Sequence, residues 1–507
     1  MSDTTVAESG TRLQNFLDRA GLRGFPWKSA TILYTISWGW LFIVRDSYWG
    51  DDWDMFTDYA NYDFGPQGFA PWYQTLVSSI QVVGPTAARL IIFASYFCVG
   101  IFLKGISERC EFLNERQSHV TVLIFLILPF NTARVSLMVL LYTLSYFAFF
   151  LAWYLLISFK TRKIFVFSLI IFFISFGMHS LLPFYFLPVL HKFFLSKCRE
   201  LRDLVLYIRV NFLMFVLPVL YWIARSIFWP EEIDYHDVGL ARLSGTASFV
   251  LFSALVSFLT FVMQRKVFAI KQSLHIISVG ILCLFFGIFA YVVLGFFPAD
   301  WSFFSKYFET FLGRSDWYSR HQTLQPLGIA LLIVGFIGLM PKFLKKFTKQ
   351  IQALVLAVCV VLNIGFGFEY VVDHSKQKDV IAVLKEEGES KLGRKYQFVD
   401  QTTLLNARGR AYRERDWKGL IWLAYGVESM QLSRVATMCE FPNKARLVLI
   451  QGPETHWDAL KNLVIDGEMS FKVTVDDTPG ACKPEMVTRE RVSGAIPILF
   501  YFTGARG

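Results

Sequence analysis

The chain has 507 residues, of which 54% are hydrophobic and only 18% are charged, and 52 of them are phenylalanine. Soluble domains carry about 25% charged residues, so this composition excludes a large soluble protein and indicates a polytopic membrane protein. The formal net charge of +10 does not indicate binding to nucleic acid, because Lys and Arg collect in the cytoplasmic loops of membrane proteins.

The N-terminal segment, 1–28, is polar and contains no long apolar run. No cleavable signal peptide is expected, and the segment is predicted to remain in the cytoplasm. Within it, Leu13, Phe16, Leu17 and Ala20 are interspersed with arginines, which indicates an amphipathic helix on the inner leaflet. Packing of the same face against a neighbouring helix is the alternative.

Eleven apolar runs follow, and several are shorter than the ~20 residues that cross a bilayer comfortably. The runs lie at 30–44, 87–103, 119–131, 135–159, 164–178, 180–195, 206–228, 247–263, 275–297, 324–340 and 350–368. Basic clusters separate them, at 160–163, 191–202, 264–266 and 342–349. These clusters share one side only if all eleven runs are crossings, and the positive-inside rule makes that side cytoplasmic. The fold expected for 29–369 is therefore an all-α polytopic bundle of about 11 transmembrane helices.

Two tight turns are expected within this bundle. The stretch 164–195 has basic residues at both ends, so it must leave the cytoplasm and return, turning at Gly177-Met-His-Ser180. The same reasoning divides 119–159 at Pro129-Phe-Asn-Thr-Ala-Arg134. Both turns would face outward. Arg134 and His179 then either point into one shared cavity or are satisfied residues of the turn or the core.

Three outward loops are predicted at 45–86, 229–246 and 298–323, and an outward C-terminal domain at 370–507. This domain has mixed polarity and alternating apolar runs such as 445–450 and 496–501. Such alternation is typical of short strands, so a small α+β domain is expected.

Two cysteines, Cys439 and Cys482, belong to this C-terminal domain. In an exported domain an isolated pair of this kind predicts a disulfide. Two reduced thiols are the alternative.

Closely spaced carboxylates mark the first outer loop, where Asp51, Asp52 and Asp54 stand among aromatic residues such as Trp53 and Tyr59. Carboxylates accept hydrogen bonds from sugar hydroxyls, and aromatic rings stack on the apolar faces of pyranoses. Partial burial at the membrane rim raises the pKa of a carboxylate and suits it to act as a general base. An interfacial aromatic belt with solvated acids is the alternative.

The Asp52-Trp-Asp54 stretch also matches the D-x-D pattern by which nucleotide-sugar enzymes hold a divalent cation. Those enzymes use a soluble nucleotide-binding domain, which this sequence lacks. No metal or other cofactor is therefore expected, and Asp52 and Asp54 would be the ligands if a cation binds.

Positive charge gathers at the end of the third outer loop, in Arg314, Arg320 and His321. Arginine binds phosphate through two parallel hydrogen bonds, and the phosphate at a membrane edge belongs to a lipid. Snorkelling of these side chains to headgroups is the alternative. Just before them, 301–314 has its apolar residues on one helical face, which indicates a helix lying in the outer interface.

The layout of about 30–370 resembles the GT-C glycosyltransferases, and within them the bacterial O-antigen glucosyltransferases of the Gtr type. The stretches that carry the resemblance are Tyr48-Trp-Gly-Asp-Asp-Trp53, Leu128-Pro-Phe-Asn-Thr-Ala-Arg134 and Tyr318-Ser-Arg-His-Gln322. The C-terminal domain takes no part in it.

The resemblance implies a multi-pass enzyme of the bacterial inner membrane with a periplasmic C-terminal domain. It would transfer a sugar, glucose in the closest relatives, from a polyprenyl-phosphate donor to a lipid-linked glycan such as the O-antigen of lipopolysaccharide, with inversion. The resemblance places the catalytic base at Asp51 or Asp52. The donor phosphate would be bound by Arg320, His321, Arg314 and Arg134, and the substrate by Asp54, Trp53, Tyr59 and His179.

Two other functions remain open. An O-antigen polymerase works on lipid-linked sugars at the same face, but it would rely more on arginines in large outer loops. A lipid or sugar transporter would place polar groups at mid-membrane and carry repeated halves, whereas here the charges crowd the outer rim and no repeat is seen.

Overall fold

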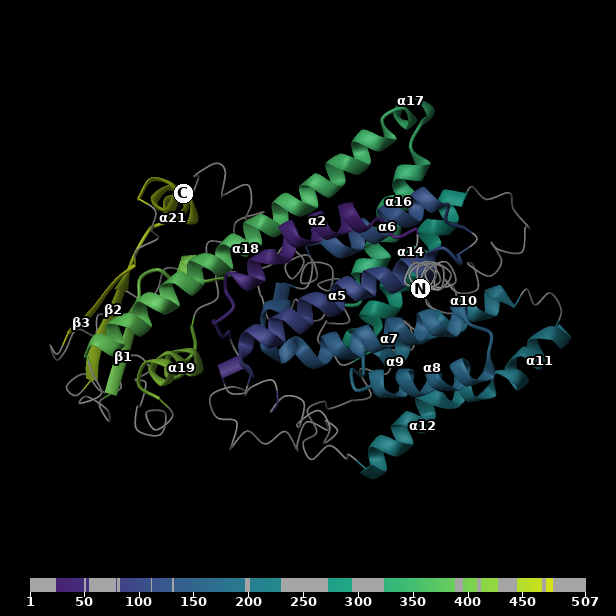
Figure 1. Cartoon of the computed structure of the whole chain (residues 1–507), viewed down its shortest axis with the longest axis horizontal. Helices are drawn as coiled ribbons and strands as arrows, with labels where there is room; N and C mark the ends of the chain where they lie inside the picture. The colour runs from purple at the N-terminus through teal and green to yellow at the C-terminus, as the bar shows by residue number, and fades with distance from the viewer. Residues whose placement is uncertain are drawn as a thin grey trace, which may run out of the picture.

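The structure is a computed structural model of the chain. It describes residues 24–49, 52–53, 79, 83–110, 112–129, 132–196, 201–228, 272–293, 323–387, 395–407, 412–426, 445–466 and 471–476. These residues form a helical bundle with a small sheet at one end (Figure 1). Several expected features lie outside the described residues: the N-terminal amphipathic helix, the loop 229–246, the run 247–263, the interface helix 301–314 and the strand 496–501.

The bundle is built from helices of very different length. In chain order they are α2 (Trp27–Trp38), η1 (Gly39–Phe42), α5 (Pro85–Ser107), α6 (Glu115–Ile127), η3 (Thr132–Val135), η4 (Leu137–Val139), α7 (Leu140–Ser158), α8 (Arg162–Ser175), α9 (Leu181–Phe184), α10 (Phe186–Leu195), α11 (Leu201–Val210), α12 (Phe212–Phe228), α14 (Gln272–Val293), α16 (Pro326–Leu339), α17 (Lys342–Lys345) and α18 (Thr348–Glu387).

Three helical segments are long and apolar enough to cross a membrane, namely Pro85–Ser107, Leu137–Ser158 and Thr348–Glu386. Shorter apolar helices cover Leu181–Leu195, Phe212–Phe228, Gln272–Ile288 and Pro326–Leu339. The mostly helical fold is therefore confirmed for the described residues, and these apolar helices are consistent with the membrane character expected from the composition. The expected count of about 11 crossings is not confirmed by the described residues.

Both predicted breaks in the apolar stretches are present. Helix α6 ends at Ile127, because Leu128 precedes Pro129 and takes an extended conformation with ψ of 130°, as residues before proline usually do. Two short 3₁₀ turns follow before α7 begins. Helix α8 ends at Ser175, and a turn over 176–180 precedes α9.

The bundle has two opposite ends, each named here after a residue that lies at it, and a hydrogen bond between separate segments marks each end. At the first, called here the Asp52 end, Arg89 at the start of α5 donates from Nη2 to the Ser47 carbonyl over 2.5 Å. At the other, called the Arg109 end, Arg116 of α6 donates to Gln352 of α18 over 2.6 Å. The basic residues of 160–163, 191–192 and 342–349 lie at the Arg109 end, as their predicted common side requires (Figure 1).

The C-terminal domain is carried on α18, whose 40 residues give a length of about 60 Å. The predicted boundary near 370 thus falls inside one continuous helix. The elements that follow are β1 (Lys395–Asp400), η7 (Thr403–Leu405), α19 (Glu414–Tyr425), β2 (Ala445–Gln451), α21 (His456–Asp466) and β3 (Lys472–Asp476).

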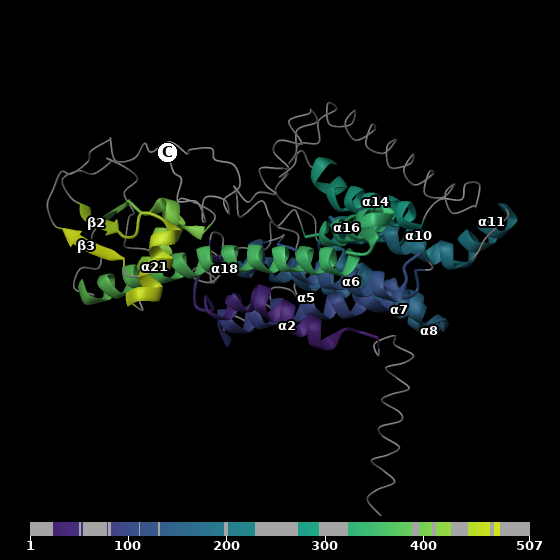
Figure 2. The ribbon, with the colours of Figure 1, turned by 90° about the horizontal axis from the view of Figure 1, so that it is seen from above.

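The three strands form a sheet in the order β1-β2-β3, which lies beside the far end of α18 (Figure 2). Strand β1 pairs parallel with β2, with Lys395 opposite Ala445. Strand β2 pairs antiparallel with β3, with Leu447 opposite Asp476. The strand predicted at 445–450 is confirmed, and the described part of the domain mixes helices with a small sheet.

Glycines allow α14 and α16 to approach closely. A Cβ at Gly328 would lie 2.8 Å from the Gly280 carbonyl oxygen and 2.8 Å from the Leu284 backbone nitrogen. Small residues at such crossings let membrane helices pack backbone to backbone.

We therefore expect Gly328→Val to destabilise the bundle by roughly 1–3 kcal/mol, since added methyl groups must push two backbones apart. The thermal unfolding midpoint of the detergent-purified protein measures the effect. Gly365→Val is the matched control, because a Cβ there meets nothing within 4 Å. Equal midpoints for the two variants would contradict the tight crossing.

Candidate functional site

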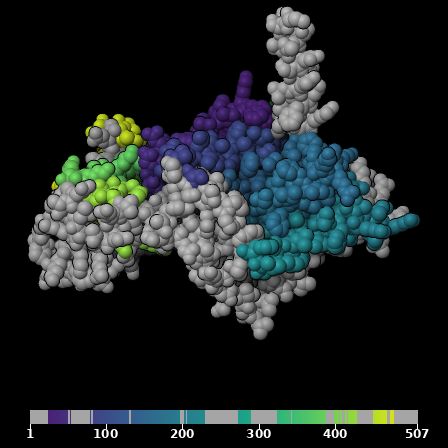
Figure 3. Space-filling model, turned by 60° about the horizontal axis from the view of Figure 1, so that its bottom comes forward, coloured from purple at the N-terminus to yellow at the C-terminus, as the bar shows by residue number. Residues whose placement is uncertain are grey.

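The anchor segment, defined as residues 47–49, 52 and 53, joins the first helices of the bundle to α18 and the C-terminal domain. Trp49 Nε1 donates to Asp373 Oδ2 over 3.2 Å, and the Tyr48 carbonyl accepts from Gln377 Nε2 over 3.2 Å. Ser47 Oγ makes a hydrogen bond with His374 Nδ1. The N-terminal part of the bundle and the C-terminal domain accordingly lie side by side (Figure 3).

Asp52 is the centre of this segment, and its side chain is fully buried. Oδ1 accepts from Ser136 Oγ over 2.5 Å and from the Met138 backbone N–H over 3.1 Å. Oδ2 accepts from the Trp49 backbone N–H over 3.2 Å. The first two donors come from the segment that follows the break at Pro129: Ser136 lies between the 3₁₀ turns η3 and η4, and Met138 lies in η4. The predicted break after α6 thus provides hydrogen-bond donors to the predicted catalytic residue Asp52.

Burial raises the pKa of Asp52 from its ordinary 3.8 to about 6. The hydrogen bonds from Ser136 and Met138 and the positive charge of Arg89 act in the opposite direction, because they favour the ionised carboxylate. Burial outweighs them, so Asp52 changes charge close to neutral pH. A carboxyl group with such a pKa can both take and release a proton under physiological conditions.

Arg89 is a buried cation whose positive charge acts on Asp52. The sequence analysis did not single it out. Its guanidinium is fully buried, donates from Nε to the Val135 carbonyl over 3.3 Å and lies 5.2 Å from the centre of the Trp49 ring. It therefore ties α5, the turn before α7 and the anchor segment together. An arginine inside the apolar run 87–103 was the available signal, because ionisable residues in such runs are costly and often functional.

A second buried polar cluster holds α18 to the C-terminal domain. Lys376 Nζ donates to Asp400 Oδ2 over 2.7 Å, and both side chains are at most 5% exposed. Lys376 also donates to Asn406. One turn earlier on α18, Asp373 accepts from the Ala407 backbone N–H over 3.0 Å and from the Tyr412 hydroxyl. Asp373 thus bonds both to the C-terminal domain and to Trp49.

Trp53 also bridges to the C-terminal domain. Its ring is 1% exposed, and its Nε1 donates to Asp416 Oδ1 of α19 over 3.0 Å. A Cβ at Gly419 would lie 2.0 Å from this ring, so only glycine fits there. The role predicted for Trp53, stacking on a sugar, stays a prediction. Its role here is to dock the anchor segment on α19.

Arg134 is buried between aromatic rings. Its guanidinium carbon lies 3.4 Å from the centre of the Trp38 ring and 4.3 Å from that of Tyr96. Arg134 therefore packs against aromatic rings in the core, near the predicted outer turn. Its predicted role in binding the donor phosphate stays a prediction.

His179 is half-buried in its predicted turn, with its ring centre 5.8 Å from Trp222 and 6.1 Å from Tyr221. Its aromatic neighbours differ from those of Arg134, and these contacts do not place the two residues in one cavity. A role for His179 in substrate binding also stays a prediction.

Other residues predicted for the site lie outside the described residues. They are Asp51, Asp54, Tyr59, Arg314, Arg320, His321 and the cysteines Cys439 and Cys482. Among the residues that the structure does describe, no group of three or more His, Cys, Asp or Glu side chains could hold a metal ion. The pairing of Asp52 with Asp54 as cation ligands is thus left as a prediction.

Comparison of the chain with known protein families, with curated proteins and with solved structures gave no match.

We expect Lys376→Met to destabilise the contact between α18 and the C-terminal domain by about 3–5 kcal/mol, because it leaves the Asp400 carboxylate buried without its cation. Limited proteolysis of the C-terminal domain and its thermal unfolding measure the loss. Lys378→Met, two residues further along α18 at an exposed position, is the control. Unchanged protease resistance in Lys376→Met would show that the buried pair does not secure the domain.

Proposed function

We propose that the chain is an integral membrane glycosyltransferase that uses a polyprenyl-phosphate sugar as donor and a lipid-linked glycan as acceptor. The observation that carries the proposal is the buried carboxylate of Asp52, with its pKa raised to about 6. A general base works best when its pKa is near the operating pH. The resemblance to the GT-C glycosyltransferases, with a catalytic acid in the first outer loop, supports the same assignment.

The reaction is a single displacement. Asp52 takes the proton of an acceptor sugar hydroxyl, and the resulting oxygen attacks the anomeric carbon of the donor from the face opposite the phosphate. The new glycosidic C–O bond forms as the bond from the anomeric carbon to the phosphate oxygen breaks. Polyprenyl phosphate leaves with the bonding electrons, so the configuration is inverted. Because that leaving group is already a stable anion, no strong general acid is needed.

The hydrogen bonds of Asp52 suggest how an acceptor hydroxyl would reach it. A carboxylate has about four lone-pair sites, and three donors occupy them here. The two backbone donors are fixed by the fold, whereas the Ser136 hydroxyl can rotate away. A sugar hydroxyl is a donor of the same kind, so it would take the place of the Ser136 hydroxyl on Oδ1. Ser136 would then occupy this lone-pair site on Oδ1 while no acceptor is bound.

The polarity of the bundle supports chemistry at the outer face. The Asp52 end carries the C-terminal domain, and the basic clusters gather at the opposite end. By the positive-inside rule, the Asp52 end would face the periplasm of a bacterial inner membrane, where lipid-linked glycans are modified. Arg320, with Arg314 and His321, remains the group proposed to stabilise the departing phosphate.

We expect Asp52→Asn to lower sugar transfer by roughly 10²–10⁴-fold, the range that a general base contributes. The measurement is release of polyprenyl phosphate by purified protein supplied with a polyprenyl-phosphate hexose and an acceptor glycan. Elution as a single species on size exclusion verifies folding.

The control for this variant is Asp46→Asn in the same loop, whose side chain is 57% exposed beside Arg45. It should retain full transfer. Asp51→Asn resolves the choice that the sequence left open. Loss in Asp51→Asn alone would move the base to Asp51, and wild-type transfer in both Asp51→Asn and Asp52→Asn would contradict the proposal.

The rate of transfer should depend on pH through Asp52. Only the ionised carboxylate accepts a proton, so kcat/KM should rise about tenfold per pH unit below pH 6 and level off above it, given a pKa raised to about 6. A base with the ordinary pKa of 3.8 would give a flat profile above pH 5. A flat profile between pH 5 and 7 would therefore contradict the raised pKa.

A further inference from the structure

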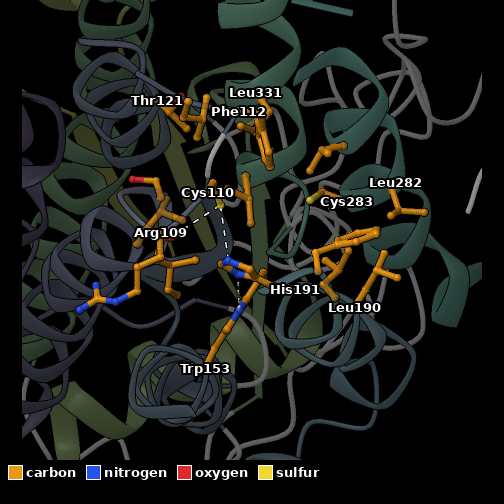
Figure 4. Close-up of a pocket in the computed structure, with 18 of the residues that line it drawn as sticks. Arg109, Cys110, Phe112, Thr121, Trp153, Leu190, His191, Leu282, Cys283 and Leu331 are labelled. Carbon is orange, nitrogen blue, oxygen red and sulfur yellow. Dashed lines mark hydrogen bonds between the residues drawn. The ribbon is translucent and has the colours of Figure 1, made fainter. Parts of the chain in front are cut away.

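A cavity of about 360 Å³ lies at the Arg109 end, away from Asp52. It is enclosed by the ends of α5 and α10 and by α6, α7, α14 and α16 (Figure 4). Most of its lining is apolar, with leucines on four helices, and its volume falls within the range of small-ligand sites. The leucines that line it are Leu103, Leu113, Leu187, Leu190, Leu195, Leu282, Leu327 and Leu331.

The lining of the cavity extends along two helices. On α14 its lining runs from His275 to Cys283, and on α10 it runs from Leu187 to Leu195. Each stretch corresponds to about 12 Å along a helix axis. A helix has a diameter of about 10 Å or more with its side chains, so a space of this volume and length cannot admit a peptide helix. A single extended hydrocarbon chain fits it.

Several polar groups in the lining are hydrogen-bonding groups, and one of them is a buried threonine hydroxyl. Thr121 is 1% exposed, and its Oγ1 has no hydrogen-bond partner among the described residues. Most buried polar side-chain atoms have a hydrogen-bond partner, so this free hydroxyl is unusual. It points to a ligand that hydrogen-bonds at this position.

His191 is another polar residue of the lining. Trp153 Nε1 donates to His191 Nδ1 over 3.2 Å, and this bond puts the imidazole proton on Nε2. Nε2 lies 3.8 Å from Cys110 Sγ, which is a weak acceptor. His191 also has a hydrogen bond with the Arg109 backbone, so the Thr121 hydroxyl is the group in the lining that suits a carbonyl oxygen of a ligand. Arg109 also lines the cavity, but its guanidinium points away from His191 (Figure 4).

The position of these groups decides which lipid they suit. The helix α5 rises about 27 Å between Arg89 and Ser107, so a headgroup at the Arg109 end cannot reach Asp52. A lipid whose headgroup lies at the Arg109 end is therefore not positioned to react at Asp52. Lys192 and Arg109, at the same end as His191, attract the phosphate of a phospholipid in that leaflet.

We propose that this cavity binds one acyl chain of a phospholipid from the leaflet at the Arg109 end. The chain lies along α14 and α10. Its ester carbonyl accepts a hydrogen bond from Thr121 Oγ1, and its phosphate stays at the surface near Lys192. The bound acyl chain fills the space between α10 and α14, so that both helices pack against it. This proposal does not depend on the glycosyltransferase activity.

Photo-crosslinking tests the occupant. The protein is placed in nanodiscs of phosphatidylethanolamine with phosphatidylglycerol that carries a diazirine in the middle of one acyl chain, and the labelled residues are mapped by mass spectrometry. We expect label on lining residues such as Leu282 and Cys283. Leu282→Phe should lower this labelling several-fold, whereas Ile281→Phe, at a 39% exposed position on the same helix, should leave it unchanged.

Two outcomes overturn the proposal. One is acyl label confined to exposed residues such as Ile281. The other is labelling of the cavity by an isoprenoid-phosphate diazirine probe in place of the acyl probe, which would identify the occupant as a polyprenyl tail.

A second pair of variants tests the hydrogen bond and preserves the shape of the cavity. Thr121→Val removes only the free hydroxyl, and Thr143→Val removes a hydroxyl that already donates to the Val139 carbonyl over 2.9 Å. Native mass spectrometry counts the phospholipid that stays bound after detergent exchange. We expect several-fold less in Thr121→Val than in Thr143→Val. Equal retention would overturn the placement of the ester at Thr121.

Discussion

The carboxylate of Asp52 is the group on which the structure of the Asp52 end depends. A buried charge is tolerated only when several donors surround it, and here these come from separate places in the sequence: the Trp49 backbone, the Ser136 hydroxyl and the Met138 backbone. To bring them together, the apolar stretch 119–159 must break where it does, and α5 must deliver Arg89 to the same place. The turn, the start of α5 and the anchor segment therefore form one cooperative unit.

The C-terminal domain is part of this arrangement. Helix α18 continues without interruption from the membrane-spanning region into the domain, and its polar half presents Asp373 and Lys376 to two different partners. Asp373 bonds Trp49 of the anchor segment, and Lys376 bonds Asp400 of β1. On the proposed function, the domain would hold the base in position from outside the membrane. Loosening it would then lower transfer even though the three hydrogen bonds described for Asp52 come from the bundle.

Much of the layout could be predicted from the sequence, and the details of the site could not. Helix-breaking by Pro129, the turn near Gly177 and the strand at 445–450 follow from local rules, and all three are present. Asp52 stood out because four carboxylates fall within eight residues. The partners of Asp52 escaped prediction because they come from distant segments, and Arg89 looked like an ordinary residue near the end of a span. The docking of Trp53 on α19 was also missed, because an aromatic residue beside acids has the same local pattern whether it binds a sugar or packs on a domain.

The most direct test of this account is a titration of Asp52 itself. Infrared difference spectra of the purified protein, with Asp52→Asn subtracted from the wild type, isolate the carboxyl band of this one residue as the pH changes. The account predicts conversion from the acid to the carboxylate with a midpoint at about pH 6. A midpoint near pH 4 would show that Asp52 is solvated, and it would contradict both its burial and its role as the base.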